Sequence, residues 1–541
     1  MLFILLGLRQ SGARLVKRRP EGVKNLTFVL KEVCFGICLD MTSSDPIPTP
    51  RLKIVNRQQM LLRTVDVERL IEPDHAARCI WEFVGRLNLD GFFRCIRSIE
   101  GYAGRSALDP QLLISLWIYA YSRGVGSARE VSRLCEMDPA FQWLTGMESI
   151  NHHTLSDFRV DHREALDELF TQVLGLLSHE GLITLERVMQ DGTKVRAQAQ
   201  ANTFCKEDRI RQHLDAARQH IQTMGDPKQE APSDHGSHAK VRAAQERVEK
   251  LERALKEVEA LRAAKMEDKR GYEPRVSVTD PDARIMKTSD GGFAPSYNMQ
   301  VVTDAHMGLI ADVRVTQDVN DKHQLLPGME GLASRLQQKP KQAVADGDFT
   351  SNLSVIQMAE HGIDFFGSWN PGPAGQKHIK PDWRGIHPEF QRDAFRYDSA
   401  QDHYVCPAGK LLVLGKTNKL PHGGEDRFYK ATRADCGPCG NRERCCPHYA
   451  SRGRIITRRV EPAVVTVFKA KMETPEAKAV YKQRSQVAEF PFAWIKEKLG
   501  LRRFHVRGLI KTGMEALWVC LTFNIQAWIR LRSKAIEAHA G

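Results

Sequence analysis

The chain has 541 residues, more than one ordinary domain needs, and its hydrophobic content of 42% is enough for sizeable cores. Residues 451–541 hold 18 Lys/Arg and 7 Asp/Glu, so this segment carries +11 of the net charge of +13. No apolar run reaches the ~18 residues that a membrane span requires. The twelve cysteines are mostly scattered singly, which argues against a secreted disulfide framework. These totals exclude a membrane-spanning protein, make the cytoplasm the default location and favour a polyanionic partner such as nucleic acid over a merely soluble basic surface.

The first segment, residues 1–54, is predicted to be a poorly structured N-terminal extension. Its opening "MLFILLGL" is only eight residues long, and the basic cluster follows the apolar part instead of preceding it. That order is the reverse of a secretory signal. Met41 and Met60 are alternative natural starts.

Residues 55–180 are rich in helical signals and are predicted to form an all-α domain. "DPQLLISLWIYAYSRG" and "SAREVSRLCEMDPAFQWLTG" are short amphipathic segments that break at Gly and Asp-Pro. In "NHHTLSDFRVDHREALDELFTQVLGLLSHEG", Thr154 is a plausible N-cap and Gly181 a plausible stop. Short helices joined by tight turns fit a helix-turn-helix whose reading helix begins near Thr154–Arg159, and they fit an ordinary helical bundle equally well.

Strand patterns dominate residues 181–369, with one helical interruption at 205–265. "LITLERVMQDGTKVRAQA" reads as a strand, and "SYNMQVVTD" with "LIADVRVTQD" reads as a β-hairpin. Helices near 322–337 and 352–361 alternate with the short strands "QAVADGDF" and "IDFFGSW". In the interruption, apolar residues recur every three or four positions on both sides of a loop, which predicts an antiparallel helical hairpin that acts as a spacer. The order of elements predicts an α/β fold with a mixed sheet flanked by helices.

A cysteine-rich insertion is expected at residues 370–460, and it looks irregular because it is rich in Gly, Pro, Cys and His. Its Cys-x₂-Cys pair has the short spacing that tetrahedral zinc favours, and a closed four-cysteine site would be structural. The candidate ligands are Cys406, Cys436, Cys439 and Cys445, with Cys446 or His448 as substitutes. The alternative is a set of free thiols. Helices return at residues 461–530, and residues 531–541 form a tail.

Three carboxylates stand out in this framework. Asp191 in "VMQDGT" and Asp346 in "AVADGD" each follow a strand, and Glu489 lies in a helical stretch of the basic segment. A single Asp-Gly is most often only a turn. Three carboxylates beside a basic surface are instead typical of a site for Mg²⁺, whose preferred ligands are oxygens and which often acts on phosphates.

The chain resembles bacterial insertion-sequence transposases of the DDE class, in the branch with a helical N-terminal domain and a cysteine-bearing insertion. The resemblance covers about residues 55–525 and is carried by "DGTKVRAQA", "TDPDARIMKTSDGGFAPSYNMQVVTD", "AVADGDFTS" and "YKQRSQVAEFPFAWIKEKLGLRRF". It implies a ribonuclease-H-like catalytic core with Mg²⁺ or Mn²⁺ held by Asp191, Asp346 and Glu489. The chain departs from the family at two positions. Asp348 stands where relatives usually have Gly, and Pro491 lies two residues after Glu489, whereas relatives often have the proline directly after the Glu.

The resemblance also assigns residues that contact DNA. The pattern Tyr481, Arg484, Glu489, Lys496 would lie within about a 140° arc of one continuous helix. Arg484 and Lys496 would then hold DNA phosphates, while Tyr481 would stack on a base or simply pack.

The implied function is a DNA transposase that acts on double-stranded DNA near the bacterial nucleoid. It would cut the ends of its element and join the 3′-hydroxyls to target DNA, as a homo-oligomer that pairs two ends. Two rival functions stay open: a metal-dependent nuclease that cuts without joining, and a DNA-binding derivative that has lost catalysis.

Overall fold

The computed structural model describes residues 58, 60, 62, 64–98, 101, 106–223, 235–264, 273–288, 291–369, 385–420, 423–447 and 453–540. The chain divides into two compact units, Met1–Thr64 and Val65–Gly541. The predicted extension at residues 1–54 therefore lies outside the described residues.

Helices fill the first part of this unit, as predicted. The central helix α3 is almost wholly buried and presents Trp117, Tyr119 and Tyr121 to a shared core. Asp109 and Asp138 cap the helices that begin with a proline, since their carboxylates accept backbone N–H bonds. The elements are η1 Val67–Leu70, α1 Ala76–Val84, α2 Asp90–Phe93, α3 Pro110–Ser122, α4 Ala128–Met137, α5 Pro139–Thr145, α6 His152–Asp161 and α7 Arg163–His179.

The N-cap of α6 differs from the prediction. The carboxamide of Asn151 accepts the N–H of His153, so the N-cap lies three residues before the expected one, Thr154. The predicted single segment from there to Gly181 is also divided into α6 and α7 at His162, which has a non-helical backbone.

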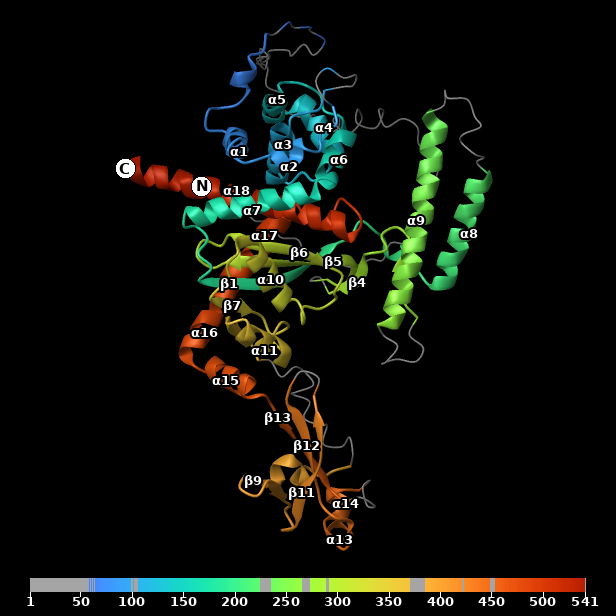
Figure 1. Cartoon of the computed structure of the whole chain (residues 1–541), viewed down its shortest axis with the longest axis vertical. Helices are drawn as coiled ribbons and strands as arrows, with labels where there is room; N and C mark the ends of the chain where they lie inside the picture. Colours follow the sequence, from blue (N-terminus) through green and yellow to red (C-terminus); the bar gives the residue numbers. More distant parts are fainter. Residues whose placement is uncertain are drawn as a thin grey trace, which may run out of the picture. The chain divides into compact units, whose positions relative to one another are not determined.

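A six-stranded mixed sheet forms the centre of the unit (Figure 1). Its order is β4-β5-β1-β7-β8, with β6 also paired to β5; β1, β7 and β8 are parallel, and β5 is antiparallel to its neighbours. These strands confirm the predicted α/β class. Their bounds, and those of the two helices between them, are β1 Arg187–Arg196, β4 Arg284–Lys287, β5 Phe293–Asp304, β6 Ile310–Thr316, α10 Leu325–Leu336, β7 Gln342–Ala345, α11 Asn352–Glu360 and β8 Asp364–Gly367.

The helical interruption is a hairpin, as predicted. Helices α8 Glu207–Thr223 and α9 His235–Ala263 pack through their own small core. Ion pairs Arg262–Glu207 and Arg218–Glu252 join opposite ends of the two helices, which shows that they run antiparallel. Two short strands, β2 Phe204–Cys205 and β3 Val276–Ser277, close the base of the hairpin.

The cysteine-rich insertion is more regular than predicted. It holds a five-stranded antiparallel sheet of order β13-β12-β11-β10-β9 around a small core. The sequence pattern concealed this sheet because most of β11 is exposed, so apolar and polar residues do not alternate along it. The elements are η3 Pro388–Phe390, η4 Arg392–Ala394, β9 Arg396–Asp398, β10 His403–Val405, β11 Leu411–Lys419, β12 Glu425–Lys430, α13 Arg433–Cys436, α14 Arg442–Cys445 and β13 Ile455–Val460.

The chain ends in four helices: α15 Ala463–Met472, α16 Pro475–Lys482, α17 Arg484–Glu497 and α18 Leu509–Ala540. The predicted continuous helix from Tyr481 to Lys496 is interrupted at Gln483, so Tyr481 belongs to α16. Pro491 lies inside α17 without ending it. Helix α18 packs against α3, α7 and β6, which ties the end of the chain to its helical beginning. Among the residues described, no helix is both long and apolar enough to cross a membrane.

Candidate active site

The two candidate aspartates lie side by side on neighbouring parallel strands. Asp191 stands in the middle of β1, and Asp346 is the first residue after β7. The strand register pairs Gln190 with Ala345, so each aspartate follows a member of the same pair. The charge of Asp346 is one of the influences that raise the pKa of Asp191, as neighbouring carboxylates do.

The prediction that β1 ends at Asp191 is wrong. The strand continues to Arg196 because it pairs with β5 along this whole length, with Gly192 opposite Gln300. Asp346 does begin a turn, in which Phe349 N–H donates to the Asp346 carbonyl at 3.3 Å. Asp346 therefore occupies a turn and also lies beside Asp191, so a turn and a site at this position are compatible.

Helix α17 brings the third carboxylate to the same place. It packs on β1 and β5, and its first residue, Arg484, reaches the candidate aspartate. Arg484 Nη1 lies 3.2 Å from Asp191 Oδ2, and its Nη2 lies 3.2 Å from Glu489 Oε1. One guanidinium therefore bridges Asp191 and Glu489, residues almost three hundred positions apart in the chain.

A second cation of α17 contacts the same strand. Lys496 Nζ donates to Thr193 Oγ1 at 2.5 Å, two residues beyond Asp191. Burial lowers the pKa of Lys496, the nearby Arg502 lowers it further, and the charge of Asp191 opposes this change. Tyr481 lines a neighbouring groove of about 810 Å³ together with Arg484 and Trp369. The structure thus places Arg484 in contact with two of the carboxylates and Lys496 on the strand of Asp191, while Tyr481, from a separate helix, lies beside Arg484.

Burial dominates the protonation of both aspartates. It raises the pKa of Asp191 to about 6, and the charges of Asp346 and Asp321 add to the increase, whereas the Gly192 N–H and Arg484 oppose it. Burial also raises the pKa of Asp346, with the N–H of Asp348 opposing and the Asp348 carboxylate adding. Partial burial thus disfavours the charged form of both carboxylates, and a cation bound beside them would offset that cost.

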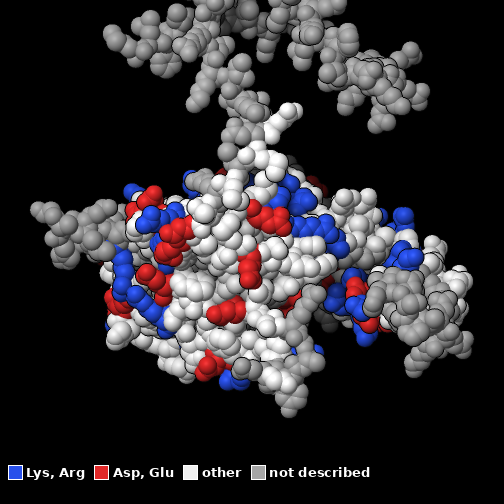
Figure 2. Space-filling view, turned by 90° about the horizontal axis from the view of Figure 1, so that it is seen from above, with Lys and Arg blue, Asp and Glu red and all other residues white. Residues whose placement is uncertain are grey.

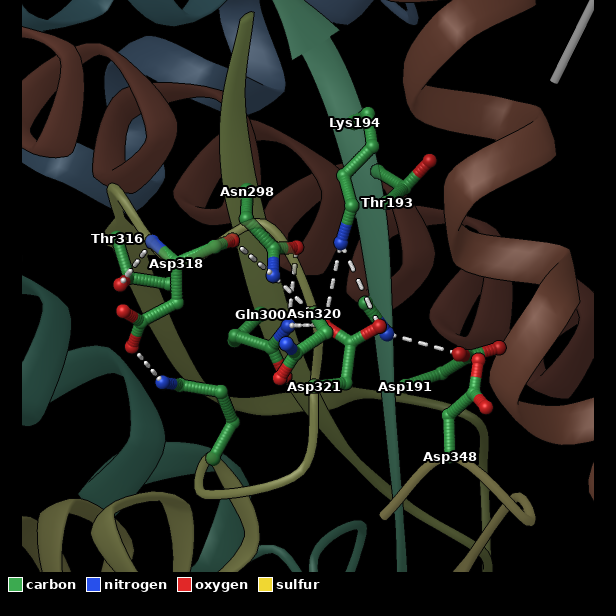
Figure 3. Close-up of polar contacts among 12 residues, drawn as sticks. Asp191, Thr193, Lys194, Asn298, Gln300, Thr316, Asp318, Asn320, Asp321 and Asp348 are labelled. Carbon is green, nitrogen blue, oxygen red and sulfur yellow. Dashed lines mark hydrogen bonds and ion pairs between the residues drawn. The ribbon is translucent and has the colours of Figure 1, made fainter. Parts of the chain in front are cut away.

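Asp348 is exposed and lies at the rim of the site. Its N–H donates to Asp346 Oδ1 at 2.8 Å, so its backbone orients the candidate ligand. Figure 3 shows its side chain directed towards Asp191.

The oxygen donors suit a hard divalent cation such as Mg²⁺. Within the described ranges, no group of three or more His, Cys, Asp or Glu side chains has an arrangement that could hold a metal ion. The Arg484 guanidinium is instead the cation between Asp191 and Glu489. The donor chemistry therefore fits Mg²⁺, and the position that a metal ion would need is partly taken by Arg484.

The cysteines of the insertion gather around one small cavity of about 30 Å³, lined by Cys406, Cys436, Cys439, Cys445 and Cys446. Backbone N–H groups donate to two of the sulfurs, from Lys410 to Cys406 at 3.2 Å and from Arg454 to Cys436 at 3.4 Å. Burial raises the pKa of Cys445 to about 12. The predicted residues are thus brought together as free thiols, and the zinc ion stays a prediction; the substitute ligand His448 lies outside the described residues.

Much of the basic segment is already paired. Lys471 contacts Asp364, Arg484 contacts Asp191, and Arg532 contacts Glu180, all acids from elsewhere in the chain. On the face shown in Figure 2, Lys and Arg groups lie among Asp and Glu groups. The net charge of +11 therefore overstates the free positive charge that this segment offers to a polyanion.

A polar cluster beside Asp191 was not predicted from the sequence. It consists of Lys194, Asn298, Gln300 and Asp321, which join β1, β5 and the loop after β6 (Figure 3). The sequence signal was Asn298 and Gln300, two carboxamides at alternate positions in residues 297–302, a stretch of β5 that is otherwise apolar. Polar side chains on a buried strand need partners, and these partners lie beside the candidate site.

Two transposase families match separate parts of the chain. Residues 65–161 match "Transposase domain (DUF772)", and residues 405–529 match "Transposase DDE domain". The second match contains Arg484, Glu489, Lys496 and the cysteine cluster, while Asp191 and Asp346 lie outside it. No curated protein and no solved structure matches the chain. The two matches, at opposite ends of one folded unit, support an insertion-sequence DDE transposase.

Proposed function

We propose that the chain is a DNA transposase whose catalytic core is ribonuclease-H-like and whose catalytic residues are Asp191, Asp346 and Glu489. The observation that carries the proposal is the bridge from Arg484 to Asp191 and Glu489, beside Asp346 at the end of the parallel strand β7. Carboxylates from three distant segments lie near the Arg484 guanidinium, and like charges that approach one another favour a cation between them.

Asp191, Asp346 and Glu489 would hold Mg²⁺ or Mn²⁺. Bound divalent cations activate an attacking oxygen and stabilise the leaving oxygen of a phosphodiester. Water would attack first and leave a 3′-hydroxyl at the element's end. That hydroxyl would then attack target DNA and expel a target 3′-oxygen, so one phosphodiester bond forms as another breaks.

Cations of α17 would orient the DNA. Arg484 and Lys496 flank the carboxylates, and phosphate oxygens are suitable partners for both side chains. Tyr481 and the neighbouring groove would receive the nucleotide beside the scissile phosphate. Residues 55–180 would bind the element's ends, and a homo-oligomer would hold two ends together in the cytoplasm, near the nucleoid.

A comparison of products separates this function from its rivals. End-labelled DNA that carries the element's terminal repeats should yield both cleaved ends and joined products with the wild-type chain. Cleavage without joining would favour a metal-dependent nuclease. Binding without either product would favour an inactive DNA-binding derivative. The cysteine cluster would bind a structural Zn²⁺. Metal analysis of the purified chain would test whether this ion is present.

Metal affinity should depend on pH through Asp191. Because its pKa is about 6 in the metal-free protein, the carboxyl is mostly protonated below pH 6, and a cation must displace that proton. We expect Mn²⁺ affinity, measured by calorimetry, to change little between pH 7 and 8 and to fall by roughly tenfold per pH unit well below 6. An affinity that stays constant from pH 5 to 8 would show that Asp191 is not a ligand.

Replacement of Arg484 by glutamine should have opposite effects on the two ligands. DNA binding should weaken and its salt slope should fall by about 1, because one phosphate contact is lost. Mn²⁺ affinity should rise, because the guanidinium no longer bridges Asp191 and Glu489. Titrations of DNA and Mn²⁺ measure both effects. The control is Arg211→Gln, which removes an exposed arginine that pairs with Glu207 in the helical hairpin; equal behaviour of the two variants would contradict the assigned role.

A further inference from the structure

One loop holds both chain neighbours of Asp191. This loop, residues 317–324, connects β6 to α10. The carboxamide of Gln190, the residue before Asp191, donates to the Gln324 carbonyl at 2.7 Å. On the other side, Asp321 Oδ1 lies 2.7 Å from the point that a Cβ on Gly192 would occupy, and the Gln300 amide lies closer still. Gly192 therefore leaves the space into which the loop and β5 pack.

Asp321 is the centre of this contact. Its Oδ1 accepts hydrogen bonds from Asn298 Nδ2 and Gln300 Nε2, both at 2.6 Å, and it lies 3.3 Å from Lys194 Nζ. The Asp321 and Lys194 side chains are only 15% and 16% exposed, so little water competes for these bonds. Figure 3 shows the three donors converging on Asp321 from two adjacent strands.

The loop itself is fixed at a second point. The Asn298 amide also donates to the Asp318 carbonyl at 3.1 Å, and the Gln324 amide donates to the Asp318 carboxylate at 2.5 Å. These hydrogen bonds link Gln190 to Lys194 through the loop. They therefore hold β1 on both sides of Asp191.

The cluster and the candidate active site occupy opposite faces of β1. Successive side chains of a strand point to opposite faces, so Gln190, Gly192 and Lys194 share one face. Asp191 and Thr193 share the other face, where they meet Arg484 and Lys496 of α17. The segment that carries Asp191 is thus held between α17 on one side and the loop on the other.

We propose that Asp321 is a positioning residue that fixes Asp191 for cation binding and catalysis, through Lys194, Gln300 and the space left by Gly192. The proposal rests on the proposed function, because it assigns Asp321 to the site that binds the cation. Asp321 is not itself assigned as a ligand, since Asn298, Gln300 and Lys194 already use its oxygens. Substitution of residues that orient metal ligands in this way typically lowers metal affinity or activity by about 10–100-fold.

The test uses full-length Asp321→Ala and Asp321→Asn, with Asn320→Ala as a matched control. Asn320 is in the same loop, but it is exposed, and its side chain accepts the Lys322 N–H at 3.3 Å. Three quantities are measured: the single-turnover rate of end cleavage at saturating DNA, the dissociation constant for DNA, and Mn²⁺ affinity of the DNA-free protein by calorimetry. We expect Asp321→Ala to lower the cleavage rate and Mn²⁺ affinity by about 10–100-fold with DNA affinity unchanged.

Asp321→Asn keeps the size of the side chain and one acceptor oxygen, so its loss should be smaller than that of Asp321→Ala. This order, with wild-type DNA affinity, supports positioning. Wild-type rate and Mn²⁺ affinity in Asp321→Ala would overturn it, and so would a loss of DNA affinity and melting temperature in proportion to the rate in both variants. If the wild-type chain itself fails to cleave while it still binds Mn²⁺, the proposed function is wrong, and a normal Mn²⁺ affinity in Asp321→Ala would then reject the inference separately.

Discussion

Asp191→Asn should reduce metal-dependent cleavage of element-end DNA by on the order of 10³-fold or more, as loss of a residue central to catalysis does. Asparagine keeps the size of the side chain but removes the charge that Arg484 contacts and that a cation would require. Glu489→Gln and Asp346→Asn should give losses of similar size. Rates from single-turnover assays with Mg²⁺ and Mn²⁺ measure the effect, and DNA affinity is measured in parallel.

The matched control is Asp348→Gly, two residues from Asp346. Asp348 contributes its backbone N–H to Asp346, and glycine keeps that donor. The variant should therefore preserve or raise activity. If Asp348→Gly stops cleavage while Asp346→Asn does not, the catalytic aspartate has been misassigned.

Glu515→Ala should destabilise the protein by about 3–5 kcal/mol, because it leaves a buried charge without its partner. Glu515 is wholly buried in α18; it accepts the N–H of His505 at 2.9 Å and contacts its ring at 2.7 Å. It also lies 3.9 Å from Arg159, whose side chain is 4% exposed. Arg159 belongs to α6, so this pair joins the segment that matches the DUF772 family to the segment that matches the DDE family.

Denaturation by urea measures the change in the free energy of unfolding. Glu497→Ala is the control, since Glu497 pairs with Arg502 on the surface and exposed pairs contribute about 0–1 kcal/mol. If the Glu515 and Glu497 variants are equally stable, the buried pair of Glu515 and Arg159 contributes no more to the free energy of unfolding than an exposed pair does.

The sequence predicted those elements in which buried apolar residues recur at a regular spacing. The β-hairpin, the helices α10 and α11, and the two helices α8 and α9 follow alternating or helical apolar patterns, and the structure contains all of them. Periodicity failed in the cysteine-rich insertion, where β11 exposes both faces and the core is only a few residues wide.

The candidate site was predicted in its composition but not in its geometry. Short sequence motifs identified Asp191, Asp346 and Glu489 as candidates, because a motif can be recognised without knowledge of the fold. The position of Asp191 inside β1 depends on pairing with β5, which is a long-range contact. The same holds for Asp321, whose partners Lys194 and Asn298 are distant in the chain and become neighbours only in the sheet. The interruption at Gln483, which separates Tyr481 from α17, has no proline or glycine to signal it.

The central claim is that the chain cuts and joins DNA with a cation held by Asp191, Asp346 and Glu489. The most direct test is incubation of the full-length chain with Mg²⁺, labelled DNA carrying the inverted repeats that flank its gene, and unlabelled target DNA. The account predicts 3′-hydroxyl ends and joined products that depend on the cation and disappear in Asp191→Asn. Products that form equally well in Asp191→Asn, or in the presence of EDTA, would contradict it.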